Sequence, residues 1–107
     1  MFCTIVSIAY IALNVNIKYK KRKIEAINKI KTASIEGKLV ECADKISNLE
    51  TLYNLYQEEG EEVWKNFNKP KEEQKWYYTN MYEAVLMNTT EKNILFDRYK
   101  KVLDKIF

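Results

Sequence analysis

Apolar residues recur at alternating intervals of four and three along residues 35–56. Ser34 suits the N-cap position before this run and Gly60 suits its C-terminal end, so we predict one long helix between them. Such spacing is typical of a helix buried along one stripe, and in a single chain we expect the stripe to face a domain core rather than a coiled-coil partner. The stripe consists of Ile35, Leu39, Cys42, Ile46, Leu49, Tyr53 and Tyr56.

Shorter helical patterns fill the rest of the chain. Residues 61–67 predict a short helical turn, which a break before Pro70 ends. Pro70 fits the first position of the next helix, expected over residues 71–87. The Asn-Thr-Thr sequence at 88–90 supplies a second break and an N-cap for a last helix over residues 91–106. The side chains expected on the buried faces are Val63, Trp64, Phe67, Tyr78, Met81, Tyr82, Val85, Leu95, Tyr99, Val102 and Ile106.

The first 17 residues are uncharged and mostly apolar, and their β-branched side chains leave helix and strand both open. As a helix they would span roughly 25 Å, which is short of the ~30 Å hydrocarbon core of a bilayer. The positive charges follow the apolar run, whereas in a signal peptide they precede it. Three interpretations remain: a buried core element, which we favour, an exposed segment whose partner is missing, and a marginal membrane anchor. We divide the chain into this segment, residues 1–17, and a helical unit, residues 18–107.

A basic run occupies residues 18–23. Isoleucines follow it at helical spacing (Ile24, Ile27 and Ile30) together with Ala26. We therefore interpret the run as the solvated first turns of an amphipathic helix. A phosphate-facing role and a membrane-surface role are the alternatives.

The composition favours one all-α domain. A chain of 107 residues with 47% apolar residues can build a core, and two Gly and one Pro leave little material for hairpins. We expect no strand after residue 18, and an α-helical bundle. The net charge of +3 is uneven, because residues 1–31 carry seven Lys or Arg against one acid. The remainder is net acidic, so we expect no nucleic-acid partner.

The chain contains no histidine. This excludes histidine-based acid–base catalysis, Ser-His-Asp and Cys-His triads, and metal sites that need imidazole. The two cysteines, Cys3 and Cys42, are not spaced as a metal-binding pair or as a disulfide framework. We therefore expect a reducing, cytoplasmic setting.

Asp44 is the candidate for a chemical role. It lies beside the apolar stripe of residues 35–56, among neighbours that are small or polar instead of long and charged. Its position alone leaves three roles open: a metal ligand, a capping partner for another helix, or an ordinary boundary residue. One aspartate is not a metal site. The neighbours at helical spacing are Val40, Ala43, Ser47, Asn48 and Thr51.

Two stretches of the sequence match sequence motifs of a known protein family. Residues 29–34 form the end of a basic helix with the pattern I-K-x-A-S, and residues 38–49 read K-L-V-E-C-A-D-K-I-S-N-L. Residues 62–68 and 71–78 have the form W-x-x-F-N followed by K-E-x-x-x-W-Y-Y. Both forms resemble HD-domain metal-dependent phosphohydrolases, in particular the guanosine-polyphosphate (ppGpp) pyrophosphohydrolase-like subgroup. The resemblance covers about residues 20–87.

The resemblance implies a fold that corresponds to the C-terminal half of an HD domain. HD enzymes bind Mn²⁺ or another divalent ion through a His, a His-Asp pair and a distant Asp, and hydrolyse phosphate esters or pyrophosphate linkages with a metal-activated water. Asp44 falls on the distant Asp. Lys45 and Asn48 match positions that lie at the substrate pocket in the subgroup.

The chain also departs from this family. The family's histidine ligands lie upstream of the matched region, and no histidine is present here. One carboxylate neither holds a transition ion tightly nor acidifies its water usefully. We therefore expect a truncated or degenerate HD phosphohydrolase that is inactive alone, with Asp44 as the single surviving ligand position. The alternative is a non-catalytic helical module that pairs with partner helices, or with itself, through residues 1–17.

Aromatic rings offer a second candidate chemistry, because exposed rings can stack on nucleic-acid bases. Their helical spacing and the few basic residues beside them in the sequence favour an ordinary role at the core and its rim. The residues concerned are Trp64, Trp76, Tyr77 and Tyr78.

Overall fold

The computed structural model describes the backbone of residues 2–67 and 69–107, and the side chains from Ile17 onward except that of Asn68. All regular secondary structure within these ranges is helical, so the predicted all-α class is confirmed. The elements are α1 (Phe2–Lys31), α2 (Ile35–Glu59), the 3₁₀ helix η1 (Gly60–Asn66), α3 (Lys71–Leu86) and α4 (Ile94–Ile106).

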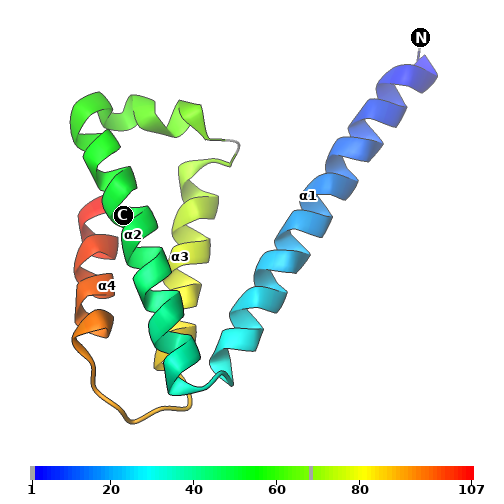
Figure 1. Ribbon diagram of the computed structural model, residues 1–107. Coiled ribbons are helices and arrows are strands. Elements are labelled where there is room, and N and C mark those ends of the chain that lie inside the picture. Colours follow the sequence, from blue (N-terminus) through cyan, green and yellow to red (C-terminus); the bar gives the residue numbers. More distant parts are fainter. Residues whose placement is uncertain (1, 68) are drawn as a thin grey trace.

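Helices α2, α3 and α4 pack side by side as the body of the bundle, and η1 crosses one end of it (Figure 1). Helix α1 meets α3 and α2 through its C-terminal half. Its N-terminal half extends away from the other helices (Figure 1). The described part measures 58 × 35 × 15 Å along its principal axes, which reflects this projecting helix.

The apolar stripe on α2 forms the main core, as predicted. Cys42 and Leu49 are fully buried and pack in one cluster with Tyr99, Val102 and Ile106 of α4. A second, smaller cluster joins α1 to α3 through Ile27, Met81 and Ala84. The periodic apolar positions therefore pack η1, α3 and α4 around α2. The second cluster attaches the C-terminal half of α1 to α3. Partly buried side chains from the predicted set border the main cluster: Ile35, Leu39, Tyr53, Tyr56, Trp64, Tyr78, Tyr82 and Leu95.

Both predicted ends of α2 are confirmed. The Ser34 side chain accepts a hydrogen bond from the backbone N–H of Gly37 at 3.2 Å, which satisfies one of the unpaired donors of the first turn. Gly60 ends the helix with φ = 65°, a conformation that a residue with a Cβ atom rarely adopts.

The predicted boundaries of the last two helices are wrong by one to three residues. Pro70 is the N-cap of α3, with ψ = 162°, rather than its first helical residue. Helix α4 begins at Ile94 and not at residue 91, because Asn93 is its N-cap and accepts a hydrogen bond from the N–H of Leu95 at 2.9 Å. Thr89 accepts from the N–H of Glu91 at 3.2 Å, so this segment forms a local turn in place of a helical start.

Two further expectations are corrected. Phe67 was expected on a buried face, but it is exposed because the chain becomes extended there, with ψ = 146°. The basic run 18–23 lies in the middle of α1 and does not form its first turns. Ile27 is buried as expected, whereas Ile24 is 42% exposed.

The backbone of the apolar N-terminal segment is helical from Phe2, and α1 continues without a break past residue 17. The side chains of residues 1–16 lie outside the described part of the structure. The three interpretations of this segment, which depend on its burial, therefore stay predictions. Among the helices that are described, none is both long enough and apolar enough to cross a membrane.

Lys38 is the most deeply buried charged side chain in the described part of the chain, with 1% of its surface exposed. Its ammonium donates to the carbonyl oxygens of Lys31 at 2.9 Å, Ala84 at 3.3 Å and Met87 at 2.5 Å. These carbonyls belong to the C-terminal ends of α1 and α3, where helices leave acceptors without intrahelical partners. Burial lowers the pKa of Lys38. One side chain of α2 thus ties together the ends of two other helices.

Candidate functional site

Asp44 lies in the middle of α2, on its solvent side. Its side chain is 59% exposed, and one oxygen, Oδ2, accepts a hydrogen bond from Lys45 Nζ at 2.8 Å. The other oxygen, Oδ1, accepts no hydrogen bond within the described part of the chain. Asp44 is therefore a charged, accessible carboxylate with one open oxygen.

Lys45 is held between two carboxylates. Its side chain is only 9% exposed, and Nζ lies 2.7 Å from Glu41 Oε1 as well as 2.8 Å from Asp44. The ammonium also lies 5.5 Å from the centre of the Tyr77 ring on α3. Burial lowers the pKa of Lys45, but the hydrogen bonds to Asp44 and Glu41 raise it more, so the net pKa lies above the ordinary value. Lys45 therefore stays protonated, and its ammonium forms ion pairs with both carboxylates.

Asn48 follows Asp44 by one helical turn and is exposed. It lies close to Tyr78 on α3, and both side chains border the same shallow hollow. Burial raises the pKa of this tyrosine, and the Asn48 contact opposes the rise. The three positions singled out from the sequence thus lie within two turns of α2, with Asp44 and Asn48 exposed and Lys45 buried between α2 and Tyr77 of α3.

The residues around Asp44 do not make a metal site by themselves. Among the described residues, no group of three or more His, Cys, Asp or Glu side chains is arranged to hold an ion. Glu41 and Asp44 come together, but the Lys45 ammonium occupies the space between them. A divalent ion would have to displace that ammonium or bind to the open Asp44 oxygen alone. The donor set therefore does not fit a tightly held Mn²⁺.

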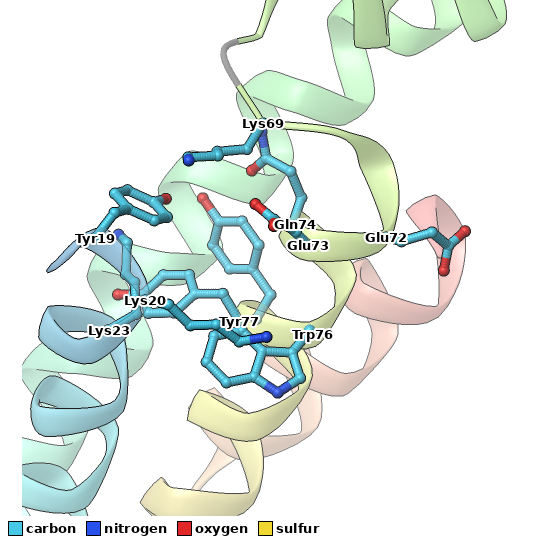
Figure 2. A pocket seen from close by; sticks show the side chains of 10 residues that line it. Tyr19, Lys20, Lys23, Lys69, Glu72, Glu73, Gln74, Trp76 and Tyr77 are labelled. Atoms are coloured by element: carbon cyan, nitrogen blue, oxygen red, sulfur yellow. The ribbon is translucent and has the colours of Figure 1, made fainter. Parts of the chain in front are cut away.

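A second feature lies between α1 and α3. It is a pocket of about 270 Å³ bordered by Lys20 and Lys23 of α1 and by Trp76 and Tyr77 of α3. Figure 2 shows these side chains around the pocket. Further lining residues are Tyr19, Lys69, Glu72, Glu73, Gln74 and Tyr78. We call it the α1–α3 pocket.

The cations of the α1–α3 pocket lie over its aromatic rings. Lys23 Nζ is 4.0 Å from the centre of the Tyr77 ring, and Lys20 Nζ is 5.5 Å from that of Trp76. Lys69 Nζ is 4.3 Å from the ring of Tyr19. Such contacts stabilise each cation by about 0.5–1 kcal/mol at exposed sites. The pocket therefore combines positive charge with flat apolar surface.

The sequence did not reveal this pocket. Trp76 and Tyr77 border the core cluster of α1 and α3, so their predicted role at the core and its rim is confirmed. The packing of α1 also brings Lys20 and Lys23 onto their rings, although these lysines lie far from them in the sequence. Trp64 differs, since it packs 5.6 Å from the ring of Phe107 at the end of the main core. The excess of positive charge in residues 1–31 was the available signal.

Comparison with known proteins finds no matching family model, no matching curated protein and no matching solved structure. The resemblance to HD phosphohydrolases is therefore carried by the residues of the two matched stretches alone. Residues 38–49 lie on α2 and residues 71–78 lie on α3.

Proposed function

We propose that this chain is the partial domain of an HD-type phosphohydrolase, derived from an enzyme that hydrolyses guanosine polyphosphate or another nucleotide with a divalent metal. It retains the distant aspartate of the metal site as Asp44 and lacks the histidine ligands. It does not hydrolyse such substrates on its own.

One observation carries the proposal: the two stretches that resemble the family contact each other through the residues expected at a substrate pocket. Lys45 of the α2 stretch lies over the ring of Tyr77 in the α3 stretch, and the Asn48 side chain lies close to that of Tyr78. Asp44 sits at the exposed edge of this contact with one oxygen open. Side chains that come together in space support a shared origin better than two separate letter matches do.

The residues have distinct roles in this proposal. Asp44 supplies a single anionic oxygen ligand, and Lys45 keeps a positive charge beside it because its pKa is raised. Asn48 presents an amide on the same face. A bound divalent ion would supply an activated water, and that chemistry needs ligands that this chain does not contain.

Mn²⁺ titration of the isotope-labelled protein tests the ligand assignment. We expect selective broadening of the NMR signals of Lys45 and Asn48, with a dissociation constant on the order of 1 mM, since one carboxylate binds a divalent ion weakly. The Asp44→Asn substitution should abolish this local broadening. Mn²⁺ binding at micromolar concentration would contradict an incomplete site.

Asp104 provides the matched control for that titration. It is 61% exposed and pairs with Lys100 at 3.1 Å, much as Asp44 pairs with Lys45. Asp104→Asn should leave the broadening around Asp44 unchanged. Equal broadening around both aspartates would show general attraction of cations to exposed carboxylates and would count against a retained ligand position.

A second candidate function is supported by the extension of the N-terminal half of α1 beyond the bundle (Figure 1). In this proposal residues 1–17 pair with a second copy of the chain. The 107-residue chain of 12.8 kDa should then elute from size-exclusion chromatography as a dimer. A variant without residues 1–17 should elute as a monomer. Monomeric elution of both proteins would exclude self-pairing through this segment.

A further inference from the structure

The α1–α3 pocket adjoins the carboxylate group around Lys45 and shares Tyr77 with it, but its cations belong to other elements. Its ammonium groups come from α1 and from Lys69, outside the helix that carries Asp44. Its floor is formed by aromatic residues of α3 (Figure 2).

Lys23 is the cation that most needs an anionic partner. It forms no ion pair within the described part of the chain, and its ammonium lies 4.0 Å from the centre of the Tyr77 ring and 5.3 Å from that of Tyr19. Burial lowers the pKa of Lys23 and the nearby charge of Lys45 lowers it further, while Glu41 raises it, so the net pKa lies below the ordinary value. An anion beside Lys23 would offset both effects.

The acidic residues of the lining do not cancel this charge. Glu72 points away from the pocket in Figure 2. Glu73 remains near Tyr19 and raises the pKa of its hydroxyl, as burial also does. Lys20 and Lys23 therefore outnumber the one carboxylate that faces the same space.

The aromatic side chains define the other half of the ligand. Trp76 and Tyr77 are half-buried and offer flat surface at the pocket. Stacking on such rings contributes roughly 1–3 kcal/mol for each planar group bound. A volume of about 270 Å³ is small for a ligand site, so it limits the ligand to about two fused rings and one substituent.

We propose that the α1–α3 pocket binds a small planar aromatic anion, whose ring displaces the ammonium groups of Lys23 and Lys20 from the faces of Tyr77 and Trp76 and whose anionic group pairs with the displaced Lys23. The anionic group is a phosphate or a carboxylate, and Lys20 lies at the same opening to assist it. The proposal uses neither Asp44 nor a metal, so it does not rest on the proposed function.

Isothermal titration calorimetry of the full-length protein tests this inference with two probes, AMP and 2-naphthoate. We expect a dissociation constant on the order of 0.1 mM for at least one of them. Adenosine and inorganic phosphate each carry half of the required chemistry and should bind roughly tenfold or more weakly. The tighter of the two probes identifies the anionic group.

Variants locate the binding. Lys23→Met should weaken it by roughly tenfold, and Lys20→Met, at an exposed position, by a smaller factor. Lys21→Met is the matched control, because Lys21 lies on the same helix beside Ile17 and Ile24 and outside the pocket. Trp76→Ala should abolish binding, whereas Trp64→Phe should not. Circular dichroism checks that each variant is folded. If Lys23→Met does not fold, the weaker binding expected of Lys20→Met tests the proposal in its place.

Four results would overturn the proposal. The first is no heat of binding with either probe up to about 5 mM. The second is inorganic phosphate binding as tightly as AMP, which would indicate a simple anion site. The third is equal weakening by Lys21→Met and Lys23→Met. The fourth is loss of binding in Asp44→Asn, which would assign the ligand to the site around Asp44 and would support the proposed function instead.

Discussion

Replacement of Lys38 by methionine is expected to lower the free energy of unfolding by about 3 kcal/mol. The methionine side chain fills a similar volume but donates no hydrogen bond. The carbonyl oxygens of Lys31, Ala84 and Met87 would then lose a charged donor inside the protein. Relief from burying the ammonium offsets part of this loss. The carbonyl of Lys31 keeps one partner, because Asn88 Nδ2 donates to it at 2.9 Å.

Urea unfolding followed by circular dichroism measures this effect. Lys100→Met is the control, since Lys100 is 53% exposed and pairs only with Asp104 at the surface. It should change the free energy of unfolding by less than about 0.5 kcal/mol. A Lys38→Met variant as stable as the Lys100→Met variant would show that the three carbonyl bonds contribute nothing.

The contrast between Cys42 and Lys38 shows what the sequence reveals about the fold. Cys42 belongs to a stripe with a regular period, and the helix caps at Ser34 and Gly60 depend on residues within a few positions. These features are local, so a pattern predicts them. Lys38 has the same local pattern as a solvated lysine. Its burial depends on where α1 and α3 end in space, which no spacing along α2 contains.

The candidate sites follow the same division. Asp44 and Lys45 are adjacent in the sequence, and their pairing could be anticipated from that alone. The α1–α3 pocket joins Lys23 to Tyr77 across two helices. The sequence pattern predicts that the basic run faces solvent and that the aromatic residues lie at the core and its rim. Only the packing of α1 on α3 shows that the two groups face each other.

Raising the pH above 9 is expected to destabilise the protein through Cys42. The thiol is fully buried in the main core, and burial, with a smaller contribution from Glu41, raises its pKa from 9.0 to about 11. Below pH 9 the thiol is protonated in both the folded and the unfolded protein, so its full contribution is present. Between pH 9 and pH 11 the unfolded chain loses this proton and the folded chain keeps it. The free energy of unfolding therefore falls by about 1.3 kcal/mol between pH 8 and pH 10 from this group, and by about 2.3 kcal/mol by pH 11.

The Cys42→Ala variant isolates that contribution. Its missing sulfur atom lowers stability at every pH, so the quantity to compare is the change between pH 8 and pH 10 under reducing conditions, measured by urea unfolding. Tyr99, whose pKa burial also raises, destabilises both proteins alike as the pH rises past 10. The wild-type protein should lose about 1.3 kcal/mol more than Cys42→Ala over this interval. Equal losses would mean that the Cys42 thiol ionises as readily in the folded protein as in the unfolded chain. That result would contradict the raised pKa expected for a thiol buried with Tyr99 and Val102.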